Sequence, residues 1–238
     1  MEIMTRPLQM KTNPFVKCVG LSVVAGVLAA VLPVQADTVY DNSTTDLNIR
    51  FNPVTREVGD EIILDGGARI LTDFTFQYWG ENFFGDDEEL RLRFYLNDGA
   101  PSQAGPLTPG TLFFDSDWFS ISETNRATLI FTDFVTGAAV PLSQNLPNSF
   151  TWTVRFRGVD AIDGESAGVD LYDPPTTGGN YNEYWENTGP GGWEYRGTNN
   201  VHINFGAKVG AVPEPSVIAL GLLGGLSALV LRNRFKRA

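Results

Sequence analysis

Apolar and polar residues alternate regularly along much of the chain between residues 37 and 211. The alternation is clearest over residues 89–97, 149–157 and 201–209, where an apolar residue occupies every second position. A period of two places successive side chains on opposite faces of a β-strand, whereas an amphipathic helix needs a period of 3.6. The pattern therefore predicts half-buried strands, each with one face toward a core.

Shorter apolar stretches predict further strands, over residues 61–64, 70–78, 111–114, 118–121, 127–134 and 169–172. Turn signals separate several of them, at Asp65-Gly66-Gly67, Asn97-Asp98-Gly99, Pro109-Gly110 and Asp163-Gly164. No long segment between these strands has apolar residues at helical spacing, so crossover helices between parallel strands are not expected.

Strands with one polar face, joined by short turns, favour antiparallel sheets that pack face to face. We therefore expect an all-β fold, an antiparallel β-sandwich of jelly-roll type, because about ten strands suit two sheets better than one. An Ig-like sandwich is the alternative, although it has fewer strands and the sequence offers no cysteine pair to support it.

Residues 212–238 divide into three parts. The motif Pro213-Glu214-Pro215 is followed by an uncharged apolar run over residues 217–231, and the chain closes with the basic residues Arg232, Arg234, Lys236 and Arg237. As a helix the run would be about 22 Å long, which is shorter than the roughly 30 Å hydrocarbon core of a bilayer. Since the run has no polar face and cations follow it directly, it predicts one transmembrane helix with its basic end in the cytoplasm.

This C-terminal segment resembles the PEP-CTERM sorting signal of Gram-negative bacteria, in which a Pro-Glu-Pro motif, an apolar helix and an arginine-rich end follow one another. The resemblance covers residues 212–238 only and carries no information about the rest of the chain. It implies that an exosortase, a membrane protease, recognises Pro213, Glu214 and Pro215 and removes the helix. The two prolines disfavour helix and strand, so the motif is expected to be extended and accessible.

The N-terminus has the features of a signal peptide. The cations Arg6, Lys11 and Lys17 precede or enter an apolar run over residues 19–32, and Ala36 stands at the position that a signal peptidase reads. We expect export by the Sec machinery and cleavage after Ala36; a retained anchor helix is the alternative. The sequence thus predicts a signal peptide (1–36), an extracytoplasmic body (37–211) and a sorting tail (212–238).

These two terminal signals predict where the protein resides. The tail would hold the body in the periplasm as an inner-membrane-anchored intermediate, with the basic end inside. Removal of the helix by the exosortase would then release the body to the cell surface or the extracellular matrix, as the resemblance implies.

Composition excludes several classes of function for the body. The only cysteine, Cys18, leaves with the signal peptide, so disulfides, thiol catalysis and cysteine-based zinc sites are excluded. The chain carries 28 acidic and 17 basic residues, and many of the basic ones lie in the leader and the tail. The body is therefore strongly acidic, which excludes binding to nucleic acid.

Catalysis is not expected. The only histidine, His202, lies on the polar side of a predicted strand, and no Gly-x-Ser-x-Gly motif accompanies it. We therefore expect no enzyme and no obligatory cofactor. A secreted glycoside hydrolase stays open as an alternative, because the many carboxylates could supply an acid and a base.

Four consecutive carboxylates form a candidate metal site, at Asp86, Asp87, Glu88 and Glu89. Four adjacent anions repel one another, and a hard cation with oxygen ligands, such as Ca²⁺, would relieve that repulsion with help from a carboxylate of a neighbouring loop. The spacing is not that of an EF-hand loop. The alternative is a solvated acidic loop that keeps a sheet edge soluble.

The segment from residue 173 to 200 is rich in glycine and asparagine, and it carries five aromatic residues: Tyr181, Tyr184, Trp185, Trp193 and Tyr195. Glu183, Glu186 and Glu194 are interleaved with them. Flat rings beside carboxylates could stack on sugar faces and bind hydroxyls, so we expect contact with extracellular polysaccharide. The alternative is that the rings cover one end of the core or form cross-strand pairs in small hairpins.

Together these patterns predict an exported surface or matrix protein, structural or adhesive in extracellular polysaccharide. A carbohydrate-binding module is the alternative, and a secreted hydrolase is a third possibility.

Overall fold

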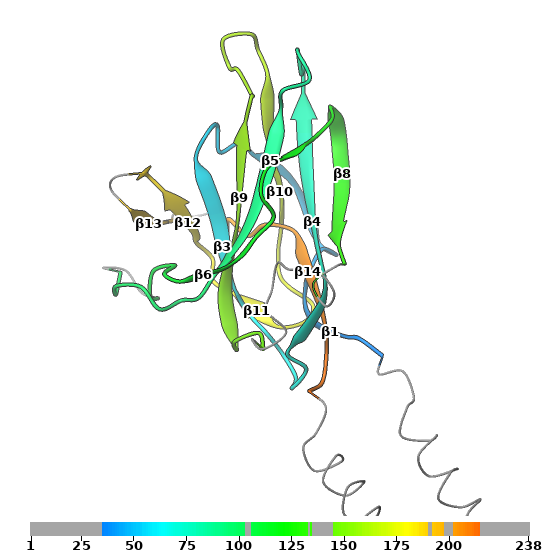
Figure 1. Ribbon diagram of the computed structural model, residues 1–238, viewed down its shortest axis with the longest axis vertical. Coiled ribbons are helices and arrows are strands. Elements are labelled where there is room, and N and C mark those ends of the chain that lie inside the picture. Colours follow the sequence, from blue (N-terminus) through cyan, green and yellow to red (C-terminus); the bar gives the residue numbers. More distant parts are fainter. Residues whose placement is uncertain are drawn as a thin grey trace, which may run out of the picture. The chain divides into compact units, whose positions relative to one another are not determined.

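The computed structural model describes residues 35–102, 106–132, 134, 145–189, 192–197 and 202–214. These residues belong to one compact unit, Gln35–Glu214. They form two antiparallel β-sheets packed face to face (Figure 1), and the expected all-β sandwich is therefore confirmed. The signal peptide up to residue 34 and the apolar run 217–231 lie outside the described residues. Within the described ranges, no helix has the length and hydropathy to cross a bilayer.

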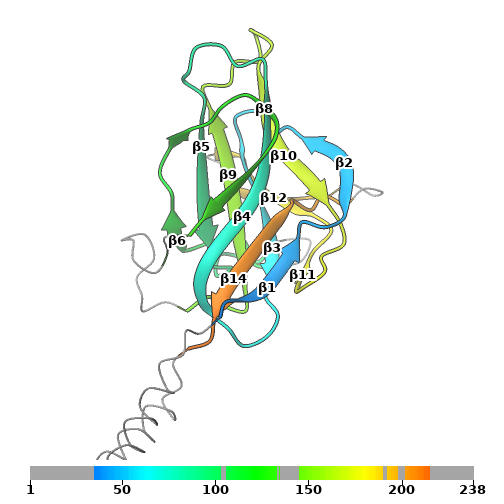
Figure 2. The ribbon, with the colours of Figure 1, turned by 90° about the vertical axis from the view of Figure 1, so that its right-hand side faces the viewer.

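The first sheet is built around its longest strand, β4, and Figure 2 views the molecule from the side of this sheet. Strand β8 pairs with one edge of β4. The other edge pairs with two strands in turn: residues 70–76 pair with β14 and residues 78–81 with β10. Beyond these, β1 pairs with β14 and β2 with β10. The bounds are β1 Asp37–Asn42, β2 Asp46–Phe51, β4 Ile70–Glu81, β8 Thr124–Phe131, β10 Ser166–Tyr172 and β14 Ala207–Val212.

The second sheet has the order β13-β12-β3-β9-β5-β6, with β11 beside β3 and β7 beside β5. Its bounds are β3 Glu57–Ile63, β5 Glu89–Tyr95, β6 Leu112–Asp115, β7 Phe119–Ser120, β9 Ser149–Arg157, β11 Gly179–Asn180, β12 Tyr184–Asn187 and β13 Trp193–Arg196. Because β9 pairs with both β3 and β5, it occupies the middle of the sheet.

An aromatic cluster fills the space between the sheets. Trp152 on β9 is 0% exposed, and its ring lies 5.3 Å from Phe74 and 5.5 Å from Phe76, both on β4. Phe94 on β5 lies 4.8 Å from Phe74. The inward positions of each alternating strand thus supply large rings that remove apolar area from water, and this burial is the main force that holds the sheets together.

The structure confirms some predicted strands and corrects others. The strand at residues 149–157 coincides with β9, and the one at 89–97 with β5 to within two residues. The strand predicted over 201–209 is wrong in its first part, because β14 begins only at Ala207. Ahead of it, the Phe205 N–H donates to the side chain of Asp60, and Phe205 forms only an isolated bridge with Leu171 of β10.

Five strands are not among those predicted. The two short strands β1 and β2 have weak alternation, and the segment 173–200, expected as a long loop, contains β11, β12 and β13. The glycine and asparagine residues of that segment therefore serve the tight turns of small hairpins, such as the one around Gly189 and Gly192, whose φ values are both 78°.

Candidate functional site

The aromatic residues of the segment 173–200 form the hairpin β12–β13. Trp185 lies directly opposite Tyr195 in the ladder, with ring centroids 4.8 Å apart. Trp185 is 0% exposed and Tyr184, at 9%, packs against Phe51 at 4.9 Å. These two rings therefore serve cross-strand pairing and the core, and their faces are not available for stacking on a sugar.

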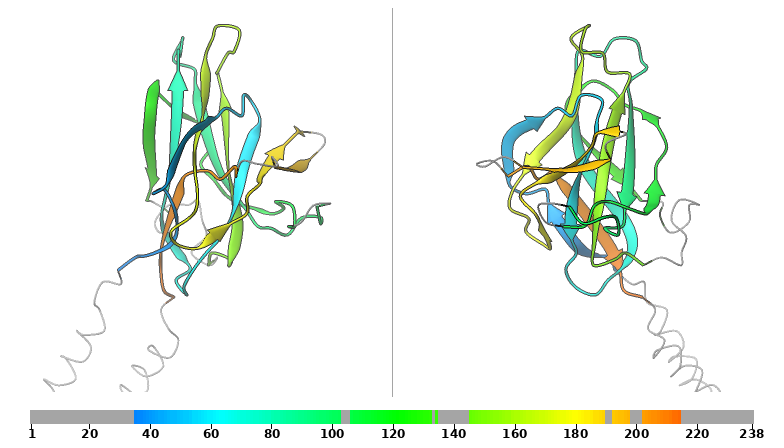
Figure 3. Two further views of the ribbon diagram at one scale, coloured as in Figure 1. Left: turned by 180° about the vertical axis from the view of Figure 1, so that it is seen from behind. Right: turned by 90° about the vertical axis from the view of Figure 1, so that its left-hand side faces the viewer.

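The hairpin turns onto the outer side of the second sheet, away from the first sheet (Figures 1 and 3). Its Trp193 ring meets Tyr95 of β5 edge-on, with centroids 5.3 Å apart, although three strands separate β13 from β5 in the sheet order. Trp193 and Tyr195 are half-buried, and Tyr181 is 39% exposed. We call Tyr181, Trp193 and Tyr195 the hairpin rings, because they keep surface that a ligand can reach.

One carboxylate accompanies the hairpin rings: the Tyr195 hydroxyl donates to Glu183 Oε2 at 3.2 Å. Glu194, between Trp193 and Tyr195 in β13, lies on the opposite face of the strand and pairs with Arg196 at 2.5 Å between Oε2 and Nη2. A bonded phenol has one orientation rather than many, so the Tyr195 ring is held in place before any ligand arrives. Preorganised rings beside charged acceptors are suited to a polyhydroxylated ligand.

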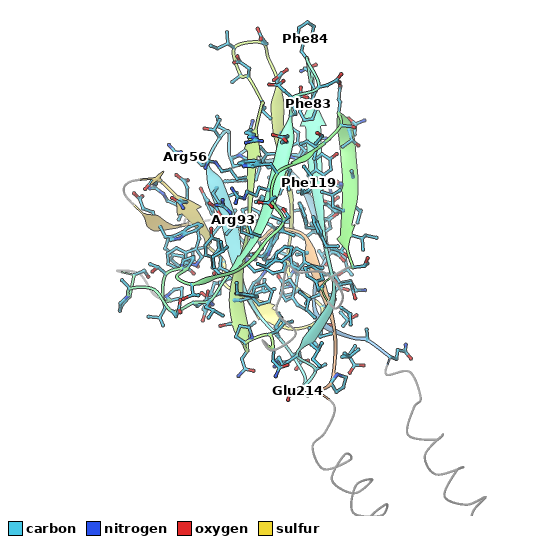
Figure 4. The ribbon with its side chains drawn as sticks, in the orientation of Figure 1. Arg56, Phe83, Phe84, Arg93, Phe119 and Glu214 are labelled. Atoms are coloured by element: carbon cyan, nitrogen blue, oxygen red, sulfur yellow. The ribbon has the colours of Figure 1, made fainter. Side chains whose placement is uncertain are left out.

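Glu57 lies beneath this region on the outer face of β3 and is 4% exposed. Its Oε1 accepts hydrogen bonds from Tyr95 Oη at 3.0 Å and Thr153 Oγ1 at 2.7 Å, and its Oε2 accepts one from Arg93 at 2.9 Å. Figure 4 labels Arg93 and Arg56 on this side of the molecule. Both carboxylate oxygens of Glu57 thus accept hydrogen bonds from residues of strands β5 and β9, so we interpret Glu57 as a residue that stabilises the second sheet.

Glu61, four residues further along β3, has a different environment. It is 5% exposed, its Oε1 accepts from Asn97 Nδ2 at 2.8 Å, and its Oε2 is buried without a hydrogen-bond partner in the described part of the chain. Burial raises the pKa of Glu61 from 4.5 to about 7, while hydrogen bonds from Ser149 and Asn97 act in the opposite direction. The alternation pattern had marked residues 61–64 as a strand but gave no sign that this carboxylate would be covered.

We expect the buried Glu61 to make stability depend on pH. Between about pH 4.5 and 7 the folded protein binds the Glu61 proton and the unfolded chain does not, so the free energy of unfolding falls as pH rises. Between pH 4 and pH 8, the free energy of unfolding of the unaltered protein should fall by about 3 kcal/mol more than that of Glu61→Gln. Urea denaturation at each pH measures this difference. A constant difference between the two proteins at all pH values would contradict it.

The four consecutive carboxylates do not converge. Asp86 and Asp87 are exposed, and Glu89 pairs with Arg157 on β9. Only Glu88 turns inward; it is 2% exposed and accepts the Phe84 N–H at 2.9 Å. Glu88 does lie close to one carboxylate of a neighbouring loop, that of Glu165.

Glu165, from the connection that precedes β10, accepts the same Phe84 N–H at 2.7 Å and the Asp160 N–H at 2.6 Å. Two buried carboxylates thus share one backbone donor. Across the described residues, no group of three or more His, Cys, Asp or Glu side chains is placed to hold a metal ion. Calcium binding by residues 86–89 stays a prediction.

The remaining candidates lie apart from the hairpin. His202 Nδ1 is 2.8 Å from Asp173 Oδ2, and the histidine side chain is 50% exposed. Ala36 is exposed directly before β1, and Pro213 and Glu214 are exposed directly after β14, while Pro215 lies outside the described residues. Since Asp37 of β1 pairs with Ala211 of β14, the two segments that carry the predicted processing sites extend from neighbouring strands.

A scan against known protein families finds no match, and neither do searches of curated proteins and of solved structures. The function therefore has to be argued from the chain's own residues.

Proposed function

We propose that this chain is an exported protein with a PEP-CTERM-type sorting signal, whose body acts as a structural or adhesive component of extracellular polysaccharide. The exposure of Ala36, Pro213 and Glu214 supports the export part, because a protease needs an extended segment that stands clear of the fold. The sandwich is of jelly-roll type in this proposal, which the number of strands and the pairing of the first strand with the last support.

The placement of the hairpin rings carries the adhesive part of the proposal. Tyr181, Trp193 and Tyr195 keep accessible surface, and Trp193 and Tyr195 lie on the outer side of the second sheet with the carboxylate of Glu183 beside Tyr195. Aromatic faces cover the apolar C–H face of a pyranose, and the carboxylate accepts hydrogen bonds from its hydroxyls. The same rings would serve a carbohydrate-binding module, which differs in recognising one defined oligosaccharide.

The geometry of β3 gives less support to a glycoside hydrolase. Glu61 has the raised pKa of a general acid, but Glu57 on the same strand is four residues away, about 13 Å along an extended backbone. Acid and base in such enzymes lie about 5 Å or 6.5–9.5 Å apart. Glu57 is also bonded to Arg93 and Tyr95. The proposal is therefore a non-enzymatic protein.

We expect the double variant Tyr181→Ala and Trp193→Ala to weaken binding to the extracellular polysaccharide of the producing cells at least tenfold, because exposed aromatic anchors carry most of the binding energy in such interfaces. Co-sedimentation of purified protein with isolated polysaccharide measures the change. Phe84→Ala is the matched control: Phe84 is 81% exposed at the tip of the β4–β5 connection, far from the hairpin (Figure 4).

Unchanged binding by the double variant would contradict the proposal, and so would an equal loss in Phe84→Ala. Thermal unfolding of each variant must match the unaltered chain, so that a loss of binding reflects the missing rings and not a loss of structure.

A further inference from the structure

Three completely buried side-chain oxygens lack a hydrogen-bond partner in the described part of the chain, and they belong to residues that contact the backbone of Phe205 or precede it directly. They are Asn42 Oδ1, Asp60 Oδ1 and Asn204 Oδ1, and each residue is 0% exposed. Asn42 Nδ2 donates to Phe205 O at 3.4 Å, and the Phe205 N–H donates to Asp60 Oδ2 at 3.2 Å. Asn204 is the preceding residue, so the three side chains belong to one cluster.

The orientation of both amides is fixed by their other contacts. Asn42 Nδ2 also donates to Tyr172 O at 2.9 Å, and Asn204 Nδ2 donates to Asp173 Oδ1 at 2.8 Å. Exchanging nitrogen and oxygen in either amide would place oxygen against oxygen. The unpartnered atoms are therefore all acceptors, which hydrogen-bond donors or a positive charge would satisfy.

The charges around Asp60 are negative. Glu61 is the next residue on β3, and Asp173 also lies close enough to act on Asp60. No lysine, arginine or histidine within the described ranges forms an ion pair with Asp60. A buried carboxylate with only anions near it is costly unless it takes up a proton or a cation joins it.

One unpartnered donor does lie close by. Trp152 stands directly opposite Asp60 in the ladder between β3 and β9, and its indole N–H has no partner among the described residues. A single N–H, directly or through a water molecule, can serve Asp60. It cannot serve the two amide oxygens as well.

We propose that Asp60, Asn42 and Asn204 hold a hard cation, Ca²⁺, between the two sheets. All three ligands are oxygens, and Ca²⁺ binds carboxylate and amide oxygens in flexible geometry, whereas zinc prefers nitrogen and sulfur. Asp173, which His202 and Asn204 hold in place, adds a second negative charge near the site. This site consists of one carboxylate and two amides and is completely buried, whereas the run at residues 86–89 consists of four carboxylates, of which Asp86 and Asp87 are exposed.

The bound ion would join three parts of the fold. Asn42 ends β1 of the first sheet, Asp60 lies on β3 of the second sheet, and Asn204 belongs to the segment that enters β14. The site is independent of the hairpin rings, so it does not rest on polysaccharide binding. Calcium is plentiful outside the cell, so this site would strengthen the sandwich only after export.

The test compares the full chain, purified in mild detergent, in 10 mM CaCl₂ and in EDTA. With a Kd of about 10⁻⁴ M, typical of extracellular modules, Ca²⁺ should raise Tm by about 5 to 10 °C. Equilibrium dialysis of the chain against millimolar radioactive Ca²⁺ should find about one bound calcium per molecule. Tb³⁺ should give luminescence excited through the nearby aromatic rings.

Two variants locate the site. Asp60→Asn should abolish both the rise in Tm and the Tb³⁺ signal, and it should unfold in EDTA no earlier than the unaltered chain, because it removes a buried charge. The double variant Asp86→Asn and Asp87→Asn is the matched control and should keep the full rise. Loss of the effect in the control, or its survival in Asp60→Asn, would overturn the proposal. So would the absence of bound metal in the unaltered chain, a measurement that does not depend on any variant folding.

Discussion

Trp152→Ala is expected to remove a large part of the free energy of unfolding of the body. Trp152 of the second sheet is 0% exposed and packs against three rings on the opposite side of the core: Phe74 and Phe76 of the first sheet, and Phe205 at 6.1 Å. Truncating such a ring leaves a cavity that the surrounding strands cannot close, at a cost of about 3 to 5 kcal/mol. That is a large part of the 5 to 15 kcal/mol, roughly, by which domains are stable.

Guanidinium denaturation, followed by near-UV circular dichroism, measures the loss. Trp118→Ala is the matched control, because Trp118 is a half-buried surface tryptophan that stacks with Arg157 at 4.3 Å and with Arg91 at 5.7 Å. Its loss should cost about 1 kcal/mol. Equal costs for the two tryptophans would show that the space between the sheets is not the main source of stability.

The second large effect concerns sorting. If the motif directs cleavage, replacing Pro213, Glu214 and Pro215 by alanine should move the protein entirely from the surface or medium to the inner-membrane fraction. An uncleaved transmembrane helix holds its protein in the bilayer effectively irreversibly. Fractionation followed by intact-mass measurement distinguishes the two forms, and the unaltered mature protein should begin at Asp37 and end near the motif.

Glu194→Ala is the control for this experiment, since it removes one exposed glutamate from the hairpin and leaves the tail unchanged. Its product should be sorted normally. A mature surface protein that still contains residues 217–231 would contradict the sorting prediction and would indicate a single-pass membrane protein.

Alternation was sufficient to predict the strands that have an apolar face. In β9 the inward residues Phe150, Trp152, Val154 and Phe156 are all 0% exposed, so the pattern and the burial agree. Alternation fails in β3, where the inward position 60 is an aspartate and the outward residues Glu57 and Glu61 are nevertheless buried by neighbouring elements. A strand with polar residues on both faces shows no alternation of apolar and polar residues, so the sequence pattern does not predict it.

The candidate site was predictable in its residue types and not in its geometry. The aromatic content of the segment 173–200 was clear, but Trp185 is buried because β12 pairs with β3, more than a hundred residues earlier in the chain. Likewise, Tyr95 meets Trp193 only through the path of the hairpin over the outer face. Pairings between distant segments depend on the whole topology, which local patterns do not contain.

The pairing of β1 with β14 has a consequence for the order of events in export. If the chain is exported as proposed, the first strand to leave the translocation channel finds its partner only when the last strand has followed, so the first sheet cannot be completed on a partly exported chain. Until then β1 and β4 have open edges, which in other proteins invite pairing with the wrong chain. The acidic character of the body would then help solubility during this interval, because like-charged chains repel one another before they are folded.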